Sequence, residues 1–316
     1  MKTTLAFFFL GLLLSETASA QFAAVQPTPA PAPTEAPALT APRVAFSVVE
    51  AGREQATMLN LRGQELTAVP AGLAELPRLQ VLNLMKNALS VLPDEVGALP
   101  ALRELIVRQN KLRTLPATIG QLQALEELDA AKNEFVTLPD AVGTLGHLQR
   151  LHLTENKLLH LPETVGGLRE LRTLELAHNA LTNLPKSLGQ LRQLRGLGLA
   201  HNQLAAVPVA LLGLPELQQL DLSFNQLTAL PKQMSQLRGL KTLVLTSNQL
   251  TALPAGIARL TELELLVVSY NRLTAFPRNL RRLRGLKTLI AVGNPLPAPE
   301  QARIRAALPN CTIRFE

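Results

Sequence analysis

A period of 23 residues runs through most of the chain and restricts it to a repeating architecture. Each unit follows the pattern L-x-x-L-x-L-x-x-N-x-L, of which residues 217–227 are a clear example. The asparagine of this pattern recurs at Asn87, Asn110, Asn133, Asn156, Asn179, Asn202, Asn225, Asn248, Asn271 and Asn294, and Gln64 holds its place one period earlier. Units of fixed length stack so that each buries its apolar face against its neighbours. We therefore expect eleven stacked units over residues 56–296.

The residues before each asparagine predict a short strand. Aliphatic residues three and five positions before it flank a variable residue, as Leu220 and Leu222 flank Asp221. Alternation with a period of two is typical of a strand, and stacked strands lie about 4.8 Å apart. A buried asparagine needs hydrogen-bond partners, and its amide both donates and accepts. We expect the ten asparagines to form a ladder that bonds the loop leaving each strand.

A second set of positions describes the side opposite the strands. Proline recurs six residues after Gln64 and after each asparagine from Asn87 to Asn271, as Pro70 to Pro277, and often belongs to the motif L-P-x-x-[IVL]-G, as in residues 115–120. Proline fixes φ and lacks an N–H, which suits a turn away from the sheet. The glycines that end this motif are expected to adopt a positive φ; they include Gly97, Gly120, Gly143, Gly166 and Gly189.

These motifs resemble those of leucine-rich repeat (LRR) proteins, in the 23-residue form of the bacterial exported type. The resemblance covers roughly residues 56–296. It implies an α/β fold: a leucine-rich repeat solenoid shaped as a curved horseshoe. Parallel strands would lie on its concave face, and short turns or 3-10 segments on its convex face. It also implies a non-catalytic module that binds a partner protein on the concave face.

The first 43 residues have a different composition. Lys2, the apolar run of residues 5–14 and Ala18-Ser19-Ala20 predict a signal peptide over residues 1–20. An uncleaved N-terminal anchor is the alternative. Residues 21–43 are rich in proline and alanine and predict a semi-extended linker. We therefore expect an exported protein that is periplasmic, on the cell surface or secreted.

Caps are expected at both ends of the stack, because its terminal units would otherwise expose their cores. Residues 44–55 form the N-terminal cap, in which Ser47 and Glu50 have capping-box spacing and predict a helix from about 47 to 55. Residues 297–316 form the C-terminal cap, with a helix near 299–308 and then a strand. The resemblance implies that Cys311, the one cysteine, faces the core there.

The variable strand positions face the concave side and supply the candidate binding residues. Asp129, His152 and Glu175 follow one another at one strand spacing, so the imidazole could bridge both acids. This row is either a metal or acid–base site or a polar surface whose charges pair across strands. The second interpretation is favoured, because the ligand set is incomplete. His178 and His201 are expected at the rim as solvated or pH-sensitive contacts.

An apolar patch is expected on the C-terminal third of the same face. Its members would point to solvent, because leucines already fill the core positions, and exposed apolar surface marks interaction sites. Coverage by the cap or by self-association is the alternative. The predicted partner-binding residues of this third and its border are Asp221, Phe224, Val244, Leu265, Val267, Tyr270 and Ile290.

Residues 279–287, NLRRLRGLK, direct Arg281, Arg282, Arg284 and Lys287 outward. They form either a solvated face or a contact with anionic envelope lipid or polysaccharide. The net charge of +7 does not by itself indicate nucleic-acid binding, and none is expected.

The sequence contains no H-E-x-x-H, Walker A or G-x-S-x-G motif and no cysteine cluster, so it favours no enzyme and no cofactor. Binding of a protein is the preferred function. Binding of a glycan or another cell-envelope polymer is the alternative, ranked lower because few aromatic residues are available. A metal-dependent enzyme comes third. The identity of the partner and the oligomeric state are not predicted.

Overall fold

The computed structural model describes residues 43–316. The signal peptide expected at residues 1–20 and the linker expected at 21–43 lie outside the described residues, apart from Arg43. No helix within the described part is long and apolar enough to cross a membrane.

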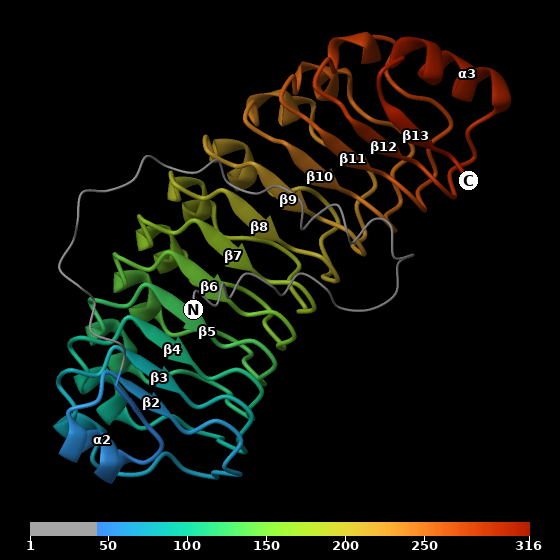
Figure 1. The fold of residues 1–316 in the computed structure, drawn as a ribbon. Helices are drawn as coiled ribbons and strands as arrows, with labels where there is room; N and C mark the ends of the chain where they lie inside the picture. The colour runs from blue at the N-terminus through green and yellow to red at the C-terminus, as the bar shows by residue number, and fades with distance from the viewer. Residues whose placement is uncertain (1–42) are drawn as a thin grey trace. The chain divides into compact units, whose positions relative to one another are not determined.

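The described residues form one open sheet of parallel strands, which follow one another in sequence order (Figure 1). Every strand of the repeat pairs with the next at a constant offset of 23 residues, as Leu220 does with Leu243. The strands are β1 (Val44–Ala45), β2 (Met58–Asn60), β3 (Val81–Asn83), β4 (Glu104–Ile106), β5 (Glu127–Asp129), β6 (Arg150–His152), β7 (Thr173–Glu175), β8 (Gly196–Gly198), β9 (Gln219–Asp221), β10 (Thr242–Val244), β11 (Leu265–Val267), β12 (Thr288–Ile290) and β13 (Thr312–Arg314).

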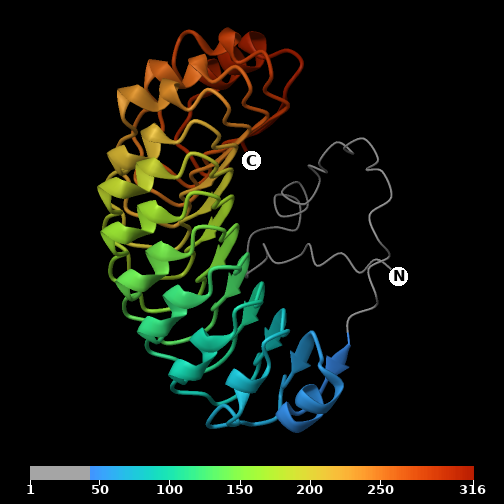
Figure 2. The ribbon, with the colours of Figure 1, turned by 90° about the vertical axis from the view of Figure 1, so that its left-hand side faces the viewer.

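A 3-10 segment returns the chain on the side opposite the strands. Figure 2 shows the strands along the concave side of the curved stack and these segments along its convex side. The expected solenoid is thus confirmed. The segments are η1 (Leu73–Glu75), η2 (Asp94–Ala98), η3 (Ala117–Gln121), η4 (Asp140–Thr144), η5 (Glu163–Gly167), η6 (Lys186–Gln190), η7 (Val209–Gly213), η8 (Lys232–Gln236), η9 (Ala255–Arg259) and η10 (Leu280–Arg282).

One continuous core of aliphatic side chains fills the space between strands and 3-10 segments. The sequence around Asn133 departs from the leucine pattern, with Ala130 and Phe135 in place of two leucines. Both side chains are fully buried. A small and a large residue therefore share the core volume that two leucines fill elsewhere.

The asparagine ladder is present as expected. Asn202 is buried, and its Nδ2 donates to the carbonyl oxygens of Leu199 at 3.1 Å and of Leu176, in the preceding unit, at 2.9 Å. Its Oδ1 accepts the N–H of Leu181 at 3.0 Å. Equivalent bonds recur at the other units, so each asparagine side chain joins the backbones of two neighbouring units.

The residue before each asparagine, and before Gln64, adopts a left-handed conformation with φ between 52° and 70°. The chain places side chains as large as Phe224 and Tyr270 there, although this region favours glycine. From Gly63 to Tyr270, the N–H of each such residue donates to a carbonyl of the next unit, as His178 does to Ala200 at 2.8 Å. This backbone hydrogen bond between neighbouring units holds the residue in its less favoured conformation.

The glycines of the outer motif serve a different purpose from the one expected. Gly97, Gly120, Gly143, Gly166 and Gly189 are absent from the positive-φ residues, so that expectation is wrong. A Cβ atom added to Gly143 would lie 2.2 Å from the carbonyl oxygen of Thr164 in the next unit. Gly97, Gly120, Gly143 and Gly166 are required because neighbouring 3-10 segments approach too closely for a side chain, and at Gly189 the approach is only slightly wider, at 3.1 Å.

Helices close both ends of the stack. Helix α2 (Val48–Glu54) begins after Ser47, whose Oγ accepts the N–H of Glu50 at 3.2 Å. Glu50 in turn accepts the N–H of Phe46 at 2.7 Å, one residue earlier than in a standard capping box. Helix α3 (Ala298–Ala307) precedes β13 at the other end.

The terminal cysteine is less buried than expected. Cys311 is half-buried and packs against the edge of the core, whereas Phe315 is buried. Partial burial raises the pKa of the Cys311 thiol to about 11, so the thiolate is a minor species at neutral pH.

Candidate functional site

The concave face is built from side chains that the sheet register brings into rows. One row crosses the stack as Asp129, His152, Glu175, Gly198, Asp221, Val244, Val267 and Ile290, each paired with the next on adjacent parallel strands. The row runs from acidic and basic residues on β5–β7 to aliphatic residues on β10–β12. The fold thus places the variable residues of the repeat on one continuous surface.

The polar end of this face is organised around Glu127. Its Oε2 accepts bonds from the Nε of Arg150 at 2.7 Å and the Nη2 at 2.5 Å. Its Oε1 lies 3.8 Å from the Nε2 of His152. Burial lowers the pKa of His152, while Asp129 and Glu127 oppose that shift. Charges on this part of the face therefore pair across strands, as the favoured interpretation expected.

The expected bridge from His152 to Glu175 is not formed. Glu175 is only 4% exposed, and its Oε1 has no hydrogen-bond partner within the described residues. Burial, with a further contribution from Asp221, raises the pKa of Glu175 well above its usual value. The row Asp129–His152–Glu175 is therefore divided: His152 interacts with Asp129 and Glu127, and Glu175 with Asp221.

Asp221 lies two strands from Glu175, with Gly198 between them. Its Oδ1 accepts the N–H of Ser223 at 2.9 Å and the Oγ of the same residue at 2.6 Å. Burial nevertheless raises the pKa of Asp221, and the two bonds from Ser223 only oppose that shift. Two carboxyl groups whose pKa values are raised by burial thus occupy the centre of the concave face.

Three rings stack at the left-handed position of successive units. The ring centroids of His178 and His201 lie 4.0 Å apart with an interplanar angle of 12°, and those of His201 and Phe224 lie 4.0 Å apart at 9°. Burial, with a contribution from His178, lowers the pKa of His201. The sequence placed these residues one unit apart, but the ring stack was not predicted.

The apolar third of the face is more closed than expected. Leu265, Val267 and Ile290 are 8%, 6% and 8% exposed, so the expectation that they point freely to solvent is wrong. Side chains at one strand spacing pack against one another across the sheet. Val244 and Phe224 are half-buried, and only Tyr270 is largely exposed, at 52%.

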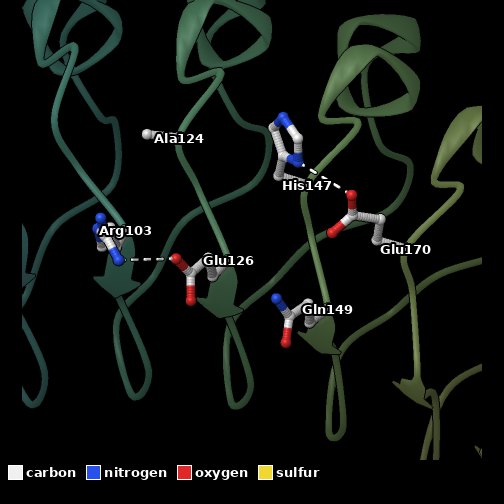
Figure 3. A pocket seen from close by; sticks show the side chains of 6 residues that line it. All are labelled: Arg103, Ala124, Glu126, His147, Gln149 and Glu170. Atoms are coloured by element: carbon white, nitrogen blue, oxygen red, sulfur yellow. Dashed lines mark hydrogen bonds and ion pairs between the residues drawn. The ribbon is translucent and has the colours of Figure 1, made fainter. Parts of the chain in front are cut away.

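A shallow hollow lies beside the concave face, where the chain runs from the 3-10 segments into the strands (Figure 3). It contains an ion pair from Arg103 to Glu126 at 3.2 Å and a hydrogen bond between the Nδ1 of His147 and Glu170 at 3.1 Å. Ala124 and Gln149 complete its lining. Across residues 43–316, no group of three or more His, Cys, Asp or Glu side chains is arranged to hold a metal ion.

The stacked units, their asparagine ladder and the variable concave face define a class of repeat proteins that offer an extended surface. A family model described as a leucine-rich repeat region matches residues 57–151 and 183–295. A second model, leucine rich repeat, matches residues 125–181 and 146–204. The chain belongs to the leucine-rich repeat family. A comparison with curated protein sequences gives no significant match.

Solved structures with the same architecture include two receptor complexes. The Toll–Spatzle complex of Drosophila is 26% identical with a TM-score of 0.72, covering 82% of this chain and 37% of that one. The plant peptide hormone receptor RGFR1 in complex with RGF2 is 29% identical with a TM-score of 0.59, covering 75% of this chain and 44% of that one. The chain therefore spans less than half the length of either receptor.

A bacterial structure is also similar. An internalin from Listeria monocytogenes has a TM-score of 0.66 at 22% identity, covering 84% of this chain and 82% of that one. At this level of identity, the likeness concerns the fold alone.

Proposed function

We propose that the chain is a non-catalytic binding module that holds a partner protein against its concave face. The observation that carries this proposal is the separation of roles within each unit. Core leucines and ladder asparagines repeat, whereas the residues of the concave rows differ from strand to strand. A surface whose composition changes along an otherwise regular scaffold is suited to recognition.

The similar receptors support the same choice of ligand class. The structure of RGFR1 contains RGF2, and that of Toll contains Spatzle. By analogy, we assign a polypeptide ligand to this chain. The export-type segment at residues 1–20 supports a location outside the cytoplasm, where the partner would also be found.

Tyr270 is the best-placed contact residue on the apolar third. Its side chain is 52% exposed. It occupies the left-handed position of its unit, as Gly293 does in the next unit. It borders the packed surface of β11 and β12. Exposed aromatic side chains beside closely packed apolar surface often dominate the binding energy of an interface. We expect the partner to cover Tyr270 and to extend over the ring stack toward the centre of the face.

Site-specific photo-crosslinking tests this proposal. A photoreactive phenylalanine derivative would replace Tyr270 in one variant and Val209 in a control variant. Val209 begins η7 on the convex side and is 78% exposed, so the control is at least as accessible. After illumination in an extract of cells that express the chain, we expect a discrete adduct of higher mass from position 270 and none from position 209.

Equal adducts at both positions, or adducts only at position 209, would contradict binding on the concave face. Digestion with a protease would establish whether the adduct is a polypeptide. A protease-resistant adduct would contradict the proposed ligand class.

A further inference from the structure

A different side of the solenoid carries an unusual density of arginine. It is the side on which each unit runs from its 3-10 segment into its strand, and Figure 3 shows part of its N-terminal half. We call the exposed arginines on its C-terminal half the basic flank: Arg192, Arg195, Arg238, Arg259, Arg282 and Arg284. They belong to the units that end at Asn202, Asn248, Asn271 and Asn294.

Backbone geometry holds these arginines in register. The N–H of Arg192 bonds to the carbonyl of Gln190 at 2.8 Å, and that of Arg238 to Gln236 at 2.9 Å. Arg284 makes the same turn with Arg282 at 2.8 Å, so the three occupy equivalent places in their units. Strands repeat about every 4.8 Å, so the basic flank extends over about 19 Å beside the strands.

Ion pairs occur on the N-terminal half of this side, although Arg169 and Arg172 there are exposed and have no ion-pair partner among the described residues. On the N-terminal half, Arg103 and His147 each pair with a glutamate of the next unit (Figure 3). Among the described residues, the six arginines of the basic flank have no ion-pair partner. Two exposed glutamates, Glu216 and Glu262, lie at neighbouring positions of the units, and Glu264 pairs with Lys287 at 2.6 Å.

Neutral polar groups accompany the arginines. Ser235, Gln236 and Thr261 line a shallow hollow together with Arg238 and Arg259. Hydroxyl and amide groups beside guanidinium groups offer hydrogen bonds to a ligand that carries both hydroxyl groups and anionic groups.

We propose that the basic flank binds an anionic polysaccharide that lies along the solenoid, with sulfate or carboxylate groups of successive sugars on successive arginines. The planar guanidinium group binds such oxyanions through paired hydrogen bonds. Sugar hydroxyls would bond to Ser235, Gln236 and Thr261 in the hollow. This site is separate from the concave face and does not depend on the function proposed for that face.

Two other polyanionic partners fit the flank less well. Membrane binding usually adds apolar side chains that insert among the lipids. The exposed large apolar residues of the C-terminal half, Val209 and Tyr270, lie on the convex and concave faces rather than on this side. Single-stranded nucleic acid is bound on aromatic platforms, and the units of the basic flank place no phenylalanine or tyrosine among its arginines.

The test uses the full chain and fluorescein-labelled dextran sulfate, with neutral dextran as the ligand control, and measures binding by fluorescence anisotropy. The flank variant is Arg238→Gln/Arg259→Gln/Arg282→Gln/Arg284→Gln. The matched control is Arg53→Gln/Arg62→Gln/Arg78→Gln/Lys111→Gln, which removes the same charge from exposed residues elsewhere. Circular dichroism spectra would establish that both variants are folded.

We expect the parent to bind dextran sulfate but not dextran, and the binding to weaken in about 0.5 M NaCl. The flank variant should lose about tenfold or more in affinity, and the control variant less than about twofold. Equal loss in both variants would show nonspecific attraction and overturn the proposal.

Two further ligands test the competing partners. Tighter binding of phosphatidylglycerol vesicles than of dextran sulfate would assign the flank to a membrane. Tighter binding of single-stranded or duplex DNA would assign it to nucleic acid. Either result, or the absence of dextran sulfate binding, would overturn the proposal.

Discussion

At the scale of single residues, the asparagine side chain determines how tightly one unit is joined to the next. Asn202 holds backbone groups of its own unit and of the unit before it, in a site that is 7% exposed. An alanine in its place would leave these buried carbonyl and N–H groups without partners. The energetic consequence is therefore the cost of several unsatisfied groups rather than the loss of one contact.

We predict that Asn202→Ala lowers the free energy of unfolding by about 1–3 kcal/mol, the cost of leaving buried polar groups unpaired. Urea denaturation followed by circular dichroism would measure this change. Asn310→Ala is the matched control, because Asn310 is exposed and no side-chain hydrogen bond of it is described. Equal stability of the parent and Asn202→Ala would contradict the role assigned to the ladder.

Glu175 provides a prediction that depends on pH. Burial raises the pKa of its carboxyl group in the folded state above the usual value of 4.5. The folded chain therefore binds this proton more tightly than the unfolded chain does. Its contribution to stability is fully present below pH 4.5 and is lost as the pH rises through the folded-state pKa.

Glutamine does not ionise, so Glu175→Gln does not lose stability as the pH rises. We expect the variant to be more stable than the parent at pH 7 by about 1–3 kcal/mol, the cost of an unsatisfied buried group. The difference should vanish near pH 4. Thermal denaturation of both proteins across this range is the measurement. A variant less stable than the parent at pH 7 would show that the carboxylate has a stabilising partner.

At the scale of elements, the 3-10 segments are packed as closely as the strands. Gly143 in η4 meets the backbone of η5, and Gly167 in η5 meets the carbonyl oxygen of Gly143 at 2.3 Å from its would-be Cβ atom. Space on the convex side is therefore limited by backbone atoms, which cannot move aside as a flexible side chain can.

Gly143 and Gly146 lie in one unit, and alanine substitutions at them distinguish the effect of close packing from that of backbone freedom. A Cβ atom at Gly143 would lie 2.2 Å from a carbonyl oxygen, whereas one at Gly146 would meet nothing within 4 Å, and neither residue has a positive φ. We predict that Gly143→Ala destabilises the chain by about 1–3 kcal/mol through overpacking. Gly146→Ala should change stability by less than about 0.5 kcal/mol. Equal effects on the melting temperature would contradict this explanation.

The sequence predicted features that depend on position within the unit. The period located the strands, the core leucines and the ladder asparagines, because each depends mainly on its own unit and its immediate neighbours. It did not reveal the left-handed residue before each asparagine, since lysine, histidine or tyrosine there gives no local signal. A clue does exist: the first and last of these positions are Gly63 and Gly293.

The candidate site was less predictable, because it depends on which neighbour each side chain approaches. The period placed His152 between Asp129 and Glu175, yet the carboxyl group of Glu175 interacts with Asp221 across Gly198. Spacing alone could not determine which neighbour Glu175 interacts with, nor the mutual packing that buries Val267 and its neighbours.

At the scale of the whole molecule, the regular scaffold carries two chemically different surfaces. The concave face combines paired charges, buried carboxyl groups with raised pKa values and packed apolar side chains, and the flank combines arginines without ion-pair partners and neutral polar groups. A substitution on one surface should leave the other unaffected, because each unit contacts only its neighbours. The photo-crosslinking and dextran sulfate experiments therefore test two independent properties.

The constant 23-residue offset between hydrogen-bonded strands also makes the length of the solenoid adjustable. Excision of residues 180–202 would join Asn179 to Gln203, and Asn225 would inherit the bonding role of the deleted Asn202. The ladder would close without a gap, whereas excision of 22 residues would leave one unit with an extra residue at the junction. The shortened chain would bring Phe224 directly onto His178 and Asp221 directly beside Glu175. Loss or gain of one unit thus rearranges the recognition surface in a single genetic event while the scaffold stays intact.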